Sequence, residues 1–368
     1  MMVRKKIIMI LILLGIAYIG ITSVVDLSQI IIPSSGVMDE NTTVPVFLGV
    51  DSKQISDYYI YMYDIPTGGI TTIASNKAGL FSPSIDDNKV VYISYSDNGP
   101  DIHVFDILSG EIKQITSDPY GQDRPQIYKN RVVWEDERSK YADGSRVTNV
   151  LDIYMHDLTT DEEMPLITTQ LKEMLPEIYG DMVVCEIYSD VAYERIYSYN
   201  ISSKELREIT SSQMMMGAPK IYMNTVVWTT LIGGGDIFAY DLVTGKKTQI
   251  TDSVEDEFDM EIYEDKIVYA KGFFESDLDI CMYDMSSGVE TRITNTPNNL
   301  ERTPKIYKDR IVYMRREGKY TNIYLYDLNT GKEIRIESTS KFNYLADIWG
   351  DKIIWAAFDV SGDKKGLL

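Results

Sequence analysis

The sequence has few of the side chains on which most catalytic and metal sites depend. Its 368 residues include only two histidines, His103 and His156, and two cysteines, Cys185 and Cys281. The two histidines stand at non-equivalent places in an internal repeat, so no histidine cluster is available for zinc or manganese. Gly-x-Ser-x-Gly elbows, phosphate loops and His-Glu-x-x-His motifs are also absent from the sequence. We therefore predict a non-enzyme with no catalytic residues, no metal ligands and no cofactor.

The two cysteines fall in predicted strands of different repeat units. This separation predicts buried free thiols, which pack as small hydrophobic groups, rather than a disulfide.

Positive charge is also scarce, because 36 Lys and Arg face 56 Asp and Glu, giving a formal net charge of −20. The first 57 residues hold four basic and five acidic residues, so the excess lies in the remainder of the chain. Nucleic acid and anionic lipid are poor partners for such a surface. The acidity is consistent with solubility in a salty or crowded exterior, or with a face that binds a cation or a cationic partner.

An internal repeat of about 43 residues dominates the sequence. A turn aspartate, replaced once by asparagine, recurs at steps of 42, 51, 43, 41, 43 and 43 residues, in the order Asp64, Asp106, Asp157, Asn200, Asp241, Asp284 and Asp327. A Pro-x-Ile-Tyr motif or a looser copy of it marks the first half of the unit at 83–86, 125–128, 176–179, 219–222, 260–263, 304–307 and 346–349. A fixed period of this length is typical of an array or a propeller.

Each unit contains four short runs of β-branched and aromatic residues separated by turn residues, which predicts four antiparallel strands. The repeats begin with a third-and-fourth-strand pair at 59–73 and end with a first-and-second-strand pair at 347–355. These pairs together make one composite blade, which removes exposed strand edges. We predict an all-β, seven-bladed β-propeller of four-stranded antiparallel blades. An extra strand at 46–50 keeps eight blades, or a differently completed seventh, as an alternative.

Two stretches of the repeat carry a family resemblance. Residues 178–185 read Ile-Tyr-Gly-Asp-Met-Val-Val-Cys, and residues 152–158 read Asp-Ile-Tyr-Met-His-Asp-Leu. This pattern resembles the TolB-like β-propeller repeats, and most closely the propellers of cell-surface proteins of methanogenic archaea. The resemblance covers about residues 58–357 and implies the propeller fold. The first hairpin lacks the Ser-Pro-Asp-Gly form usual in bacterial members, with only a trace at 82–87.

The N-terminal segment has the pattern of a membrane anchor. Arg4, Lys5 and Lys6 precede an uncharged, largely apolar run of 19 residues at 7–25, long enough as a helix to span a bilayer. Basic residues before the run and acids after it predict a cytoplasmic N-terminus and an exported propeller. We therefore divide the chain into an uncleaved signal anchor at 1–27, an extracytoplasmic tether at 28–57 and the propeller at 58–368. Cleavage near residues 34–36 is the alternative.

Export makes two sequons relevant. Asn41 and Asn200 begin Asn-x-Ser/Thr triplets and are glycosylation candidates.

The candidate binding residues come from the segments that precede the innermost strands, because these segments vary between units and converge on the central channel. They include Asp123, Arg124, Glu257, Glu301, Arg302 and Tyr344. Such a mixed set at one channel mouth could hold a polar ligand or a peptide. Ordinary loops with ion pairs are the alternative interpretation. Acid-rich turns at 251–257 and 276–279 offer oxygen ligands of the kind calcium uses, but lack the EF-hand spacing. Two insertions, at 139–150 and 233–235, are candidate interaction loops.

Three functions remain open. The first is a monomeric, single-pass, membrane-anchored propeller that serves as a non-catalytic protein-interaction or cell-envelope scaffold, with an envelope protein or glycan as partner. The second is binding of carbohydrate or another small polar ligand at the channel mouth. The third is a polysaccharide lyase or hydrolase, with Glu257 and Glu301 as the carboxylate pair of a glycosidase.

Overall fold

The computed structural model describes residues 55–138, 150–169, 171–189, 193–210, 217–230, 235–273, 277–297, 299–338, 340 and 342–361. These residues form β-strands joined by turns and short irregular segments, and no helix occurs among them. The strand considered at 46–50 and the apolar run at 7–25 lie outside the described residues, as do most of the two insertions. Within the described part of the chain, no helix is long and apolar enough to cross a membrane.

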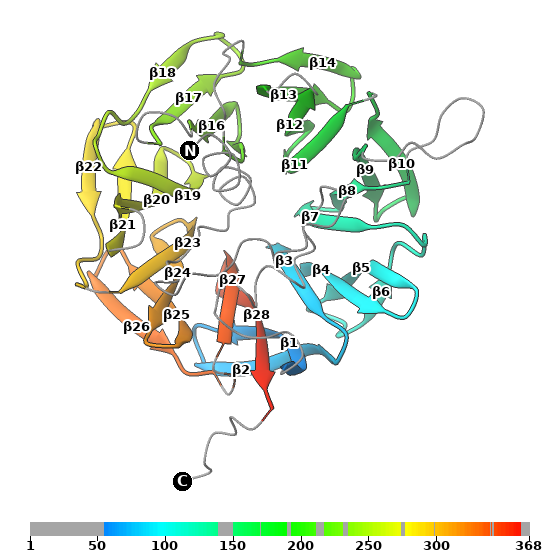
Figure 1. Cartoon of the computed structure of the whole chain (residues 1–368), viewed down its shortest axis with the longest axis horizontal. Helices are drawn as coiled ribbons and strands as arrows, with labels where there is room; N and C mark the ends of the chain where they lie inside the picture. Colours follow the sequence, from blue (N-terminus) through cyan, green and yellow to red (C-terminus); the bar gives the residue numbers. More distant parts are fainter. Residues whose placement is uncertain are drawn as a thin grey trace, which may run out of the picture.

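The strands are arranged in antiparallel sets of four, and each set is one blade of a β-propeller (Figure 1). From the inner to the outer strand, the first three sets are β3 (Leu80–Asp86), β4 (Lys89–Ser96), β5 (Gly99–Asp106) and β6 (Ile112–Gln114); β7 (Gln122–Tyr128), β8 (Arg131–Asp136), β9 (Asp152–Asp157) and β10 (Glu162–Ile167); and β11 (Lys172–Tyr179), β12 (Met182–Ser189), β13 (Tyr193–Asn200) and β14 (Glu205–Glu208).

The sets that follow repeat this order. They are β15 (Lys220–Tyr222), β16 (Thr225–Thr229), β17 (Ile237–Asp241) and β18 (Lys247–Gln249); β19 (Asp256–Tyr263), β20 (Lys266–Phe273), β21 (Asp277–Asp284) and β22 (Val289–Arg292); and β23 (Leu300–Tyr307), β24 (Arg310–Glu317), β25 (Tyr320–Asp327) and β26 (Lys332–Ile336). The prediction of four strands per repeat unit is therefore confirmed for these units.

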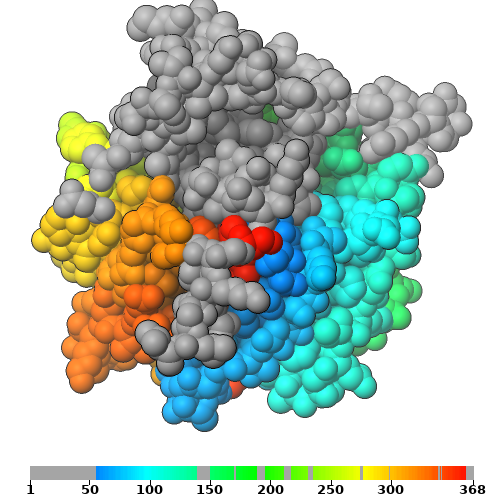
Figure 2. Space-filling view, turned by 60° about the horizontal axis from the view of Figure 1, so that its bottom comes forward, coloured from blue at the N-terminus to red at the C-terminus, as the bar shows by residue number. Residues whose placement is uncertain are grey.

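The remaining set joins the two ends of the repeat region. Its order is β27 (Phe342–Trp349), β28 (Lys352–Val360), β1 (Ile55–Asp64) and β2 (Gly69–Asn76). The β1–β28 pairing is antiparallel and runs from Ile55 opposite Val360 to Asp64 opposite Lys352. Figure 2 shows the blue residues of β1 and β2 between the orange and the cyan parts of the chain. The predicted exchange of strands between the two ends is confirmed.

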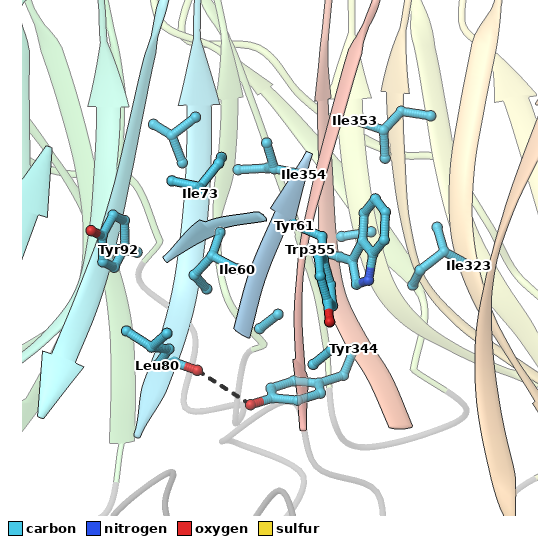
Figure 3. Close-up of a cluster of buried hydrophobic side chains, with 14 of the residues drawn as sticks. Ile60, Tyr61, Ile73, Leu80, Tyr92, Ile323, Tyr344, Ile353, Ile354 and Trp355 are labelled. Atoms are coloured by element: carbon cyan, nitrogen blue, oxygen red, sulfur yellow. Dashed lines mark hydrogen bonds between the residues drawn. The ribbon is translucent and has the colours of Figure 1, made fainter. Parts of the chain in front are cut away.

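Burial explains the continuous apolar runs of the second strands. Val132, Val133 and Trp134 on β8 are each fully buried, because this strand is covered on both faces by neighbouring blades. A short run that is apolar at every position is consistent with such a strand. In the composite blade, the ring of Trp355 on β28 packs against Tyr61 on β1 with a centroid distance of 5.5 Å (Figure 3).

The turns follow the chemistry that the sequence suggested. The side chain of Asp327 accepts a 2.8 Å hydrogen bond from the backbone N–H of Thr330, as a turn-capping aspartate does. Gly331 follows with a φ of 65°, a conformation that glycine adopts without steric cost. The same capping occurs at five other aspartate and asparagine positions of the repeat, and Asp157 caps its turn by accepting from the backbone N–H of Thr159, two residues on.

Candidate functional site

The inner strand of each blade presents two side chains to the central channel. In the Pro-x-Ile-Tyr motif, the buried isoleucine, such as Ile178, points into the blade. Successive side chains of a strand point to opposite faces, so the x residue and the tyrosine, here Glu177 and Tyr179, share the other face. Each x residue pairs with the same position of the second strand, as Glu177 does with Val184 and Lys305 with Val312. The repeat therefore builds two stacked rings, one of x residues and one mainly of tyrosines.

The ring of x residues, which we call the charged belt, consists of Ser84, Gln126, Glu177, Lys220, Glu261, Lys305 and Asp347. Signs alternate along its charged part. The ammonium of Lys220 contacts the carboxylate of Glu177 and lies 3.9 Å from Glu261, and the ammonium of Lys305 also contacts Glu261. The belt therefore links successive blades through ion pairs across the channel wall.

Burial and these pairs set the pKa values of the belt. Burial raises the pKa of Glu177 even though the ammonium groups of Lys220 and Lys305 favour its ionised form. Burial acts in the same direction on Glu261, but Lys305 and Lys220 outweigh it and lower its pKa. Asp347 has a raised pKa, chiefly through burial. The lysines thus compensate Glu261 fully, but Glu177 and Asp347 only in part.

The second ring, which we call the aromatic ring, is formed by six side chains in sequence around the channel. Consecutive centroids lie 4.7, 4.9, 4.9, 5.1 and 4.8 Å apart in the order Tyr128, Tyr179, Tyr222, Tyr263, Tyr307 and Trp349. Adjacent rings are tilted by 43–56°, within the favourable range for aromatic pairs. The first blade has Asp86 at the equivalent position, so one carboxylate stands between Trp349 and Tyr128 in the ring.

The aromatic ring opens into a cavity of about 350 Å³, within the range of small-ligand sites. We call this cavity the tyrosine cup. Its lining residues are Asp86, Asp87, Lys89, Tyr128, Lys129, Asn130, Tyr179, Tyr222, Tyr263 and Trp349. The cup combines aromatic surface, phenol hydroxyls and a carboxylate at one end of the channel.

Asp86 is the buried charge of the tyrosine cup. Its side chain is 5% exposed, and it accepts a 2.5 Å hydrogen bond from the backbone N–H of Lys129. Burial raises its pKa to about 6, with the nearby Asp87 and Asp347 acting in the same direction. The Lys129 hydrogen bond and ammonium oppose this shift without cancelling it. The carboxylate therefore has less positive compensation than its burial requires.

The six residues predicted from the sequence do not line the tyrosine cup. Arg124 lies four residues before Tyr128 on β7. Since a strand rises about 3.3 Å per residue, the two residues are roughly 13 Å apart along the channel. The predicted segments are also part of the inner strands rather than loops before them. Each described segment passes through a β-bulge, such as the one between Asp123 and Gln126, where Arg124 has a φ of 51°.

Glu257 and Glu301 occupy equivalent positions on β19 and β23, and both are buried. Glu257 accepts a 2.7 Å hydrogen bond from the Ser253 hydroxyl and lies 3.4 Å from the ammonium of Lys271. Burial raises the pKa of Glu257 to about 7 despite these partners. Glu301 accepts a 2.6 Å hydrogen bond from Arg315. Each glutamate therefore already has hydrogen-bond or ion-pair partners among neighbouring residues of the channel wall.

The other four residues also make structural contacts. Arg302 donates two hydrogen bonds, of 2.6 and 2.9 Å, to the carboxylate of Asp259 and so links β23 to β19. The Tyr344 hydroxyl lies 3.3 Å from the Leu80 carbonyl oxygen, to which it donates (Figure 3). The Arg124 guanidinium lies 4.0 Å from Asp123 and 3.7 Å from Glu135.

Sequence reasoning missed the tyrosine cup, although its signal was present. As repeated residues, the tyrosines of Pro-x-Ile-Tyr mark the repeat and do not stand out as functional. Because strand side chains alternate, a buried Ile between a polar x residue and Tyr already indicates that both neighbours face the channel. The replacement of Tyr by Asp86 in one copy was the feature that distinguished a site from repeated packing.

The histidines, cysteines and acidic turns have packing partners. His156 is buried on β9 with Nε2 3.0 Å from Asp161, and the ring of His103 on β5 stacks on Tyr92. Cys185 and Cys281 are buried and free, as predicted. The acid-rich segment at 276–279, predicted as a turn, belongs from Asp277 onward to strand β21, where Asp279 accepts a 2.7 Å hydrogen bond from Arg292. Across the described ranges, His, Cys, Asp and Glu form no group of three or more that could hold a metal ion.

Of the two sequons, Asn41 lies outside the described residues. Asn200 caps a turn by accepting a 2.8 Å hydrogen bond from the backbone N–H of Ser203. Its Nδ2, the atom that would carry a glycan, lies 3.3 Å from the Met182 sulfur.

Comparison with known proteins places the fold. The propeller domain of the Trilobed protease from Pyrococcus furiosus superposes with a TM-score of 0.58 at 14% identity, covering 74% of this chain and 87% of that one. A putative TolB from Agrobacterium tumefaciens gives a TM-score of 0.50 at 13% identity, covering 82% and 98%. An oligogalacturonate lyase in complex with manganese gives 0.54 at 11% identity, covering 82% and 90%.

These similarities define the class of protein. The chain is a β-propeller with a TolB-like fold, as the repeat predicted. No protein-family model matches it, and no curated protein is similar enough to match.

Proposed function

We propose that this chain is a non-catalytic protein-interaction module, a seven-bladed propeller held outside the cytoplasm by an N-terminal anchor. The observation that carries the proposal is the tyrosine cup, a cavity of about 350 Å³ at one end of the channel with a buried carboxylate in its wall. Aromatic side chains around a polar group are typical of the anchoring pockets of interfaces. The pairing of β1 with β28 supports a closed ring of seven blades. Such a ring offers its partner a rigid platform.

The membrane anchor is supported by the sequence. The uncharged run at 7–25 follows Arg4, Lys5 and Lys6, which favours an N-terminus in the cytoplasm. The resemblance of the repeat to that of archaeal cell-surface propellers, which rests on the sequence motifs alone, also favours a propeller on the outer side. Fractionation of cells that make the full-length protein should recover it with membranes, whereas a chain beginning at residue 28 should be recovered in soluble form. Recovery of both forms in the soluble fraction would contradict the anchor.

A non-catalytic role is supported by the surroundings of the titratable residues. Glu257 and Glu301 each form ion pairs inside the wall, and the two histidines pack in separate strands. The similar oligogalacturonate lyase is in complex with manganese, whereas among the described residues of this chain no group of three or more His, Cys, Asp and Glu could hold a metal ion. Assays against polysaccharides with the wild type and Glu257→Gln should show no turnover that depends on this carboxylate.

The partner should be identified in cells. Affinity-tagged full-length protein would be crosslinked in intact cells and the attached proteins identified by mass spectrometry, with Tyr222→Leu as a variant that alters the tyrosine cup. A reproducible envelope protein that is captured by the wild type and lost from the variant is the expected result. Equal capture by both would contradict the cup as the contact surface. No captured protein would contradict the interaction role.

A second candidate is binding of carbohydrate or another small polar ligand in the same cup. The observation in its favour is the arc of four tyrosines whose hydroxyls interact with their neighbours along the ring, Tyr128, Tyr179, Tyr222 and Tyr263. Hydroxyls of this kind can donate to and accept from sugar hydroxyls. Binding of a neutral saccharide that is lost in Tyr222→Leu would favour this candidate over a protein partner.

A further inference from the structure

The channel wall carries more carboxylates than ammonium groups. The described residues of the charged belt and the aromatic ring include four acids, Asp86, Glu177, Glu261 and Asp347, but only two bases, Lys220 and Lys305. Lys220 contacts Glu177, and Lys305 contacts Glu261. Lys220 also lies 3.9 Å from Glu261, and Lys305 favours the ionised form of Asp347 without cancelling the effect of burial. Asp86 belongs to the first blade, whose belt residue is Ser84, so its own blade supplies no lysine to either ring.

The lysines at the rim of the tyrosine cup do not form an ion pair with Asp86. The ammonium of Lys89 lies 3.9 Å from Asp106, and that of Lys129 lies 5.3 Å from the centroid of the Tyr128 ring. Lys129 reaches Asp86 through its backbone N–H instead. A cation that entered the cup would therefore meet a carboxylate whose charge is only partly balanced.

The chemistry of the cup favours an organic cation over a metal ion. Hard cations such as calcium take six to eight oxygen ligands, and the carboxylates described here do not converge into such a set. Aromatic rings attract ammonium and guanidinium groups, which lose less hydration than a metal ion. Five aromatic side chains beside one buried carboxylate suit a group with an apolar stem and a charged end.

We infer that the tyrosine cup receives the side chain of an arginine or lysine from the partner protein, with its cationic group at Asp86. This inference rests on the proposed interaction function and specifies the chemistry of the contact. The aliphatic stem packs against the aromatic ring, while the cationic group hydrogen-bonds to the carboxylate between Trp349 and Tyr128. The formal charge of −20 attracts a basic partner toward this surface.

The test uses a basic tripeptide as a probe of full-length protein in detergent micelles. The probe is acetyl-Gly-Arg-Gly-amide, and its neutral match contains citrulline in place of arginine. Trp349 is the reporter, because it lines the cup while Trp134, Trp228 and Trp355 are fully buried. Its indole N–H resonance in tryptophan-labelled protein, assigned with Trp349→Phe, should shift with the arginine peptide at millimolar concentration and stay in place with the citrulline peptide.

Two variants separate the cup from general electrostatics. Asp86→Asn removes the charge while keeping an oxygen that can accept from Lys129, and it should weaken the arginine peptide at least about tenfold. Glu205→Gln, which removes an exposed acid from the outer strand β14, should leave binding unchanged. Equal response to the two peptides, an unaffected Asp86→Asn variant, or no response to either peptide would overturn the inference.

The result is distinguishable from failure of the proposed function. Suppose that an envelope protein is captured through the cup in cells but the arginine peptide gives no response. The proposed interaction function would then hold, and only the inference that the cup receives a basic side chain would fail. A response to N-acetylglucosamine without a response to arginine would overturn the inference and favour the second candidate.

Discussion

The carboxylate of Asp86 accepts a hydrogen bond of 2.5 Å from the backbone N–H of Lys129 and so joins the end of β3 to the turn between β7 and β8. In the other repeats, a tyrosine or tryptophan stands at the position of Asp86. The first blade thus replaces a ring-to-ring contact with a polar contact to the next blade. This replacement gives the aromatic ring a single charged member.

Asp86 should make stability depend on pH. Its pKa is raised to about 6, above the ordinary value near 3.8 that holds in the unfolded chain. Between pH 4 and 6 the folded state therefore binds more protons at this site than the unfolded state, and the free energy of unfolding falls as pH rises. The cost reaches at most about 3 kcal/mol above pH 6. Asp87, Asp347, Lys89 and Lys129 surround the group and remain in both proteins that are compared.

Urea unfolding of the wild type and Asp86→Asn at several pH values measures this contribution. The Asp86→Asn variant and the wild type should have equal free energies of unfolding near pH 4, and the variant should be the more stable of the two at pH 7. A difference between the two proteins that stays constant from pH 4 to 7 would show that burial does not raise this pKa.

The charged belt should stabilise the ring through its lysines. Lys305→Met leaves Glu261 with one cation fewer and removes the charge that favours ionised Asp347. We expect a loss of about 2–4 kcal/mol at pH 7, because removal of one partner leaves a poorly solvated charge. The loss should shrink when Glu261→Gln is added, since the two residues contact each other. Chemical denaturation measures both, with the exposed Lys332→Met on β26 as control.

Arg302 should act in folding and not in binding. Its two hydrogen bonds to Asp259 tie neighbouring blades, and both side chains are nearly buried. Arg302→Ala should therefore lower the free energy of unfolding by about 3 kcal/mol and leave the affinity for the arginine peptide unchanged. If the folded variant lost peptide binding, the binding site would lie at the end of the channel predicted from the sequence and not in the tyrosine cup.

The composite blade should be sensitive to its aromatic core. Trp355 is fully buried on β28 and contacts Tyr61 on β1, so Trp355→Ala should cost about 3–5 kcal/mol. Leu108 is 78% exposed on a rim turn, and Leu108→Ala should change stability by less than about 0.5 kcal/mol. Equal unfolding midpoints for the two variants would contradict packing of β1 against β28.

The sequence predicted the fold because the same strand and turn signals recur in every repeat unit. The turn aspartates, the turn glycines and the Val-rich second strands each recur, and each has a local physical cause that the structure confirms. The exchange of strands between 59–73 and 347–355 followed from counting strands at the two ends.

The site could be predicted only in part. Variation between repeats indicates Glu257, Glu301 and Arg302 as candidate functional residues. In the structure, Glu257 and Glu301 form ion pairs with Lys271 and Arg315 on the adjacent strands of their own blades. Arg302 forms an ion pair with Asp259 on the neighbouring blade. Which residues become such neighbours depends on strand register and blade packing, which the variation between repeats does not show. The aromatic ring, which contains Tyr128 and Tyr179, is predictable only from the alternation of side chains along the inner strand. This alternation places the repeated tyrosines on the face toward the channel.

Photo-crosslinking in cells shows whether the partner contacts the tyrosine cup. A photoreactive amino acid would replace the exposed Asn130 at the rim of the cup or, in a second protein, the exposed Asp252 before the inner strand β19. We expect a crosslinked partner from position 130, none from position 252, and loss of the adduct when Asp86→Asn is added. An adduct from position 252 alone would contradict the cup as the contact surface.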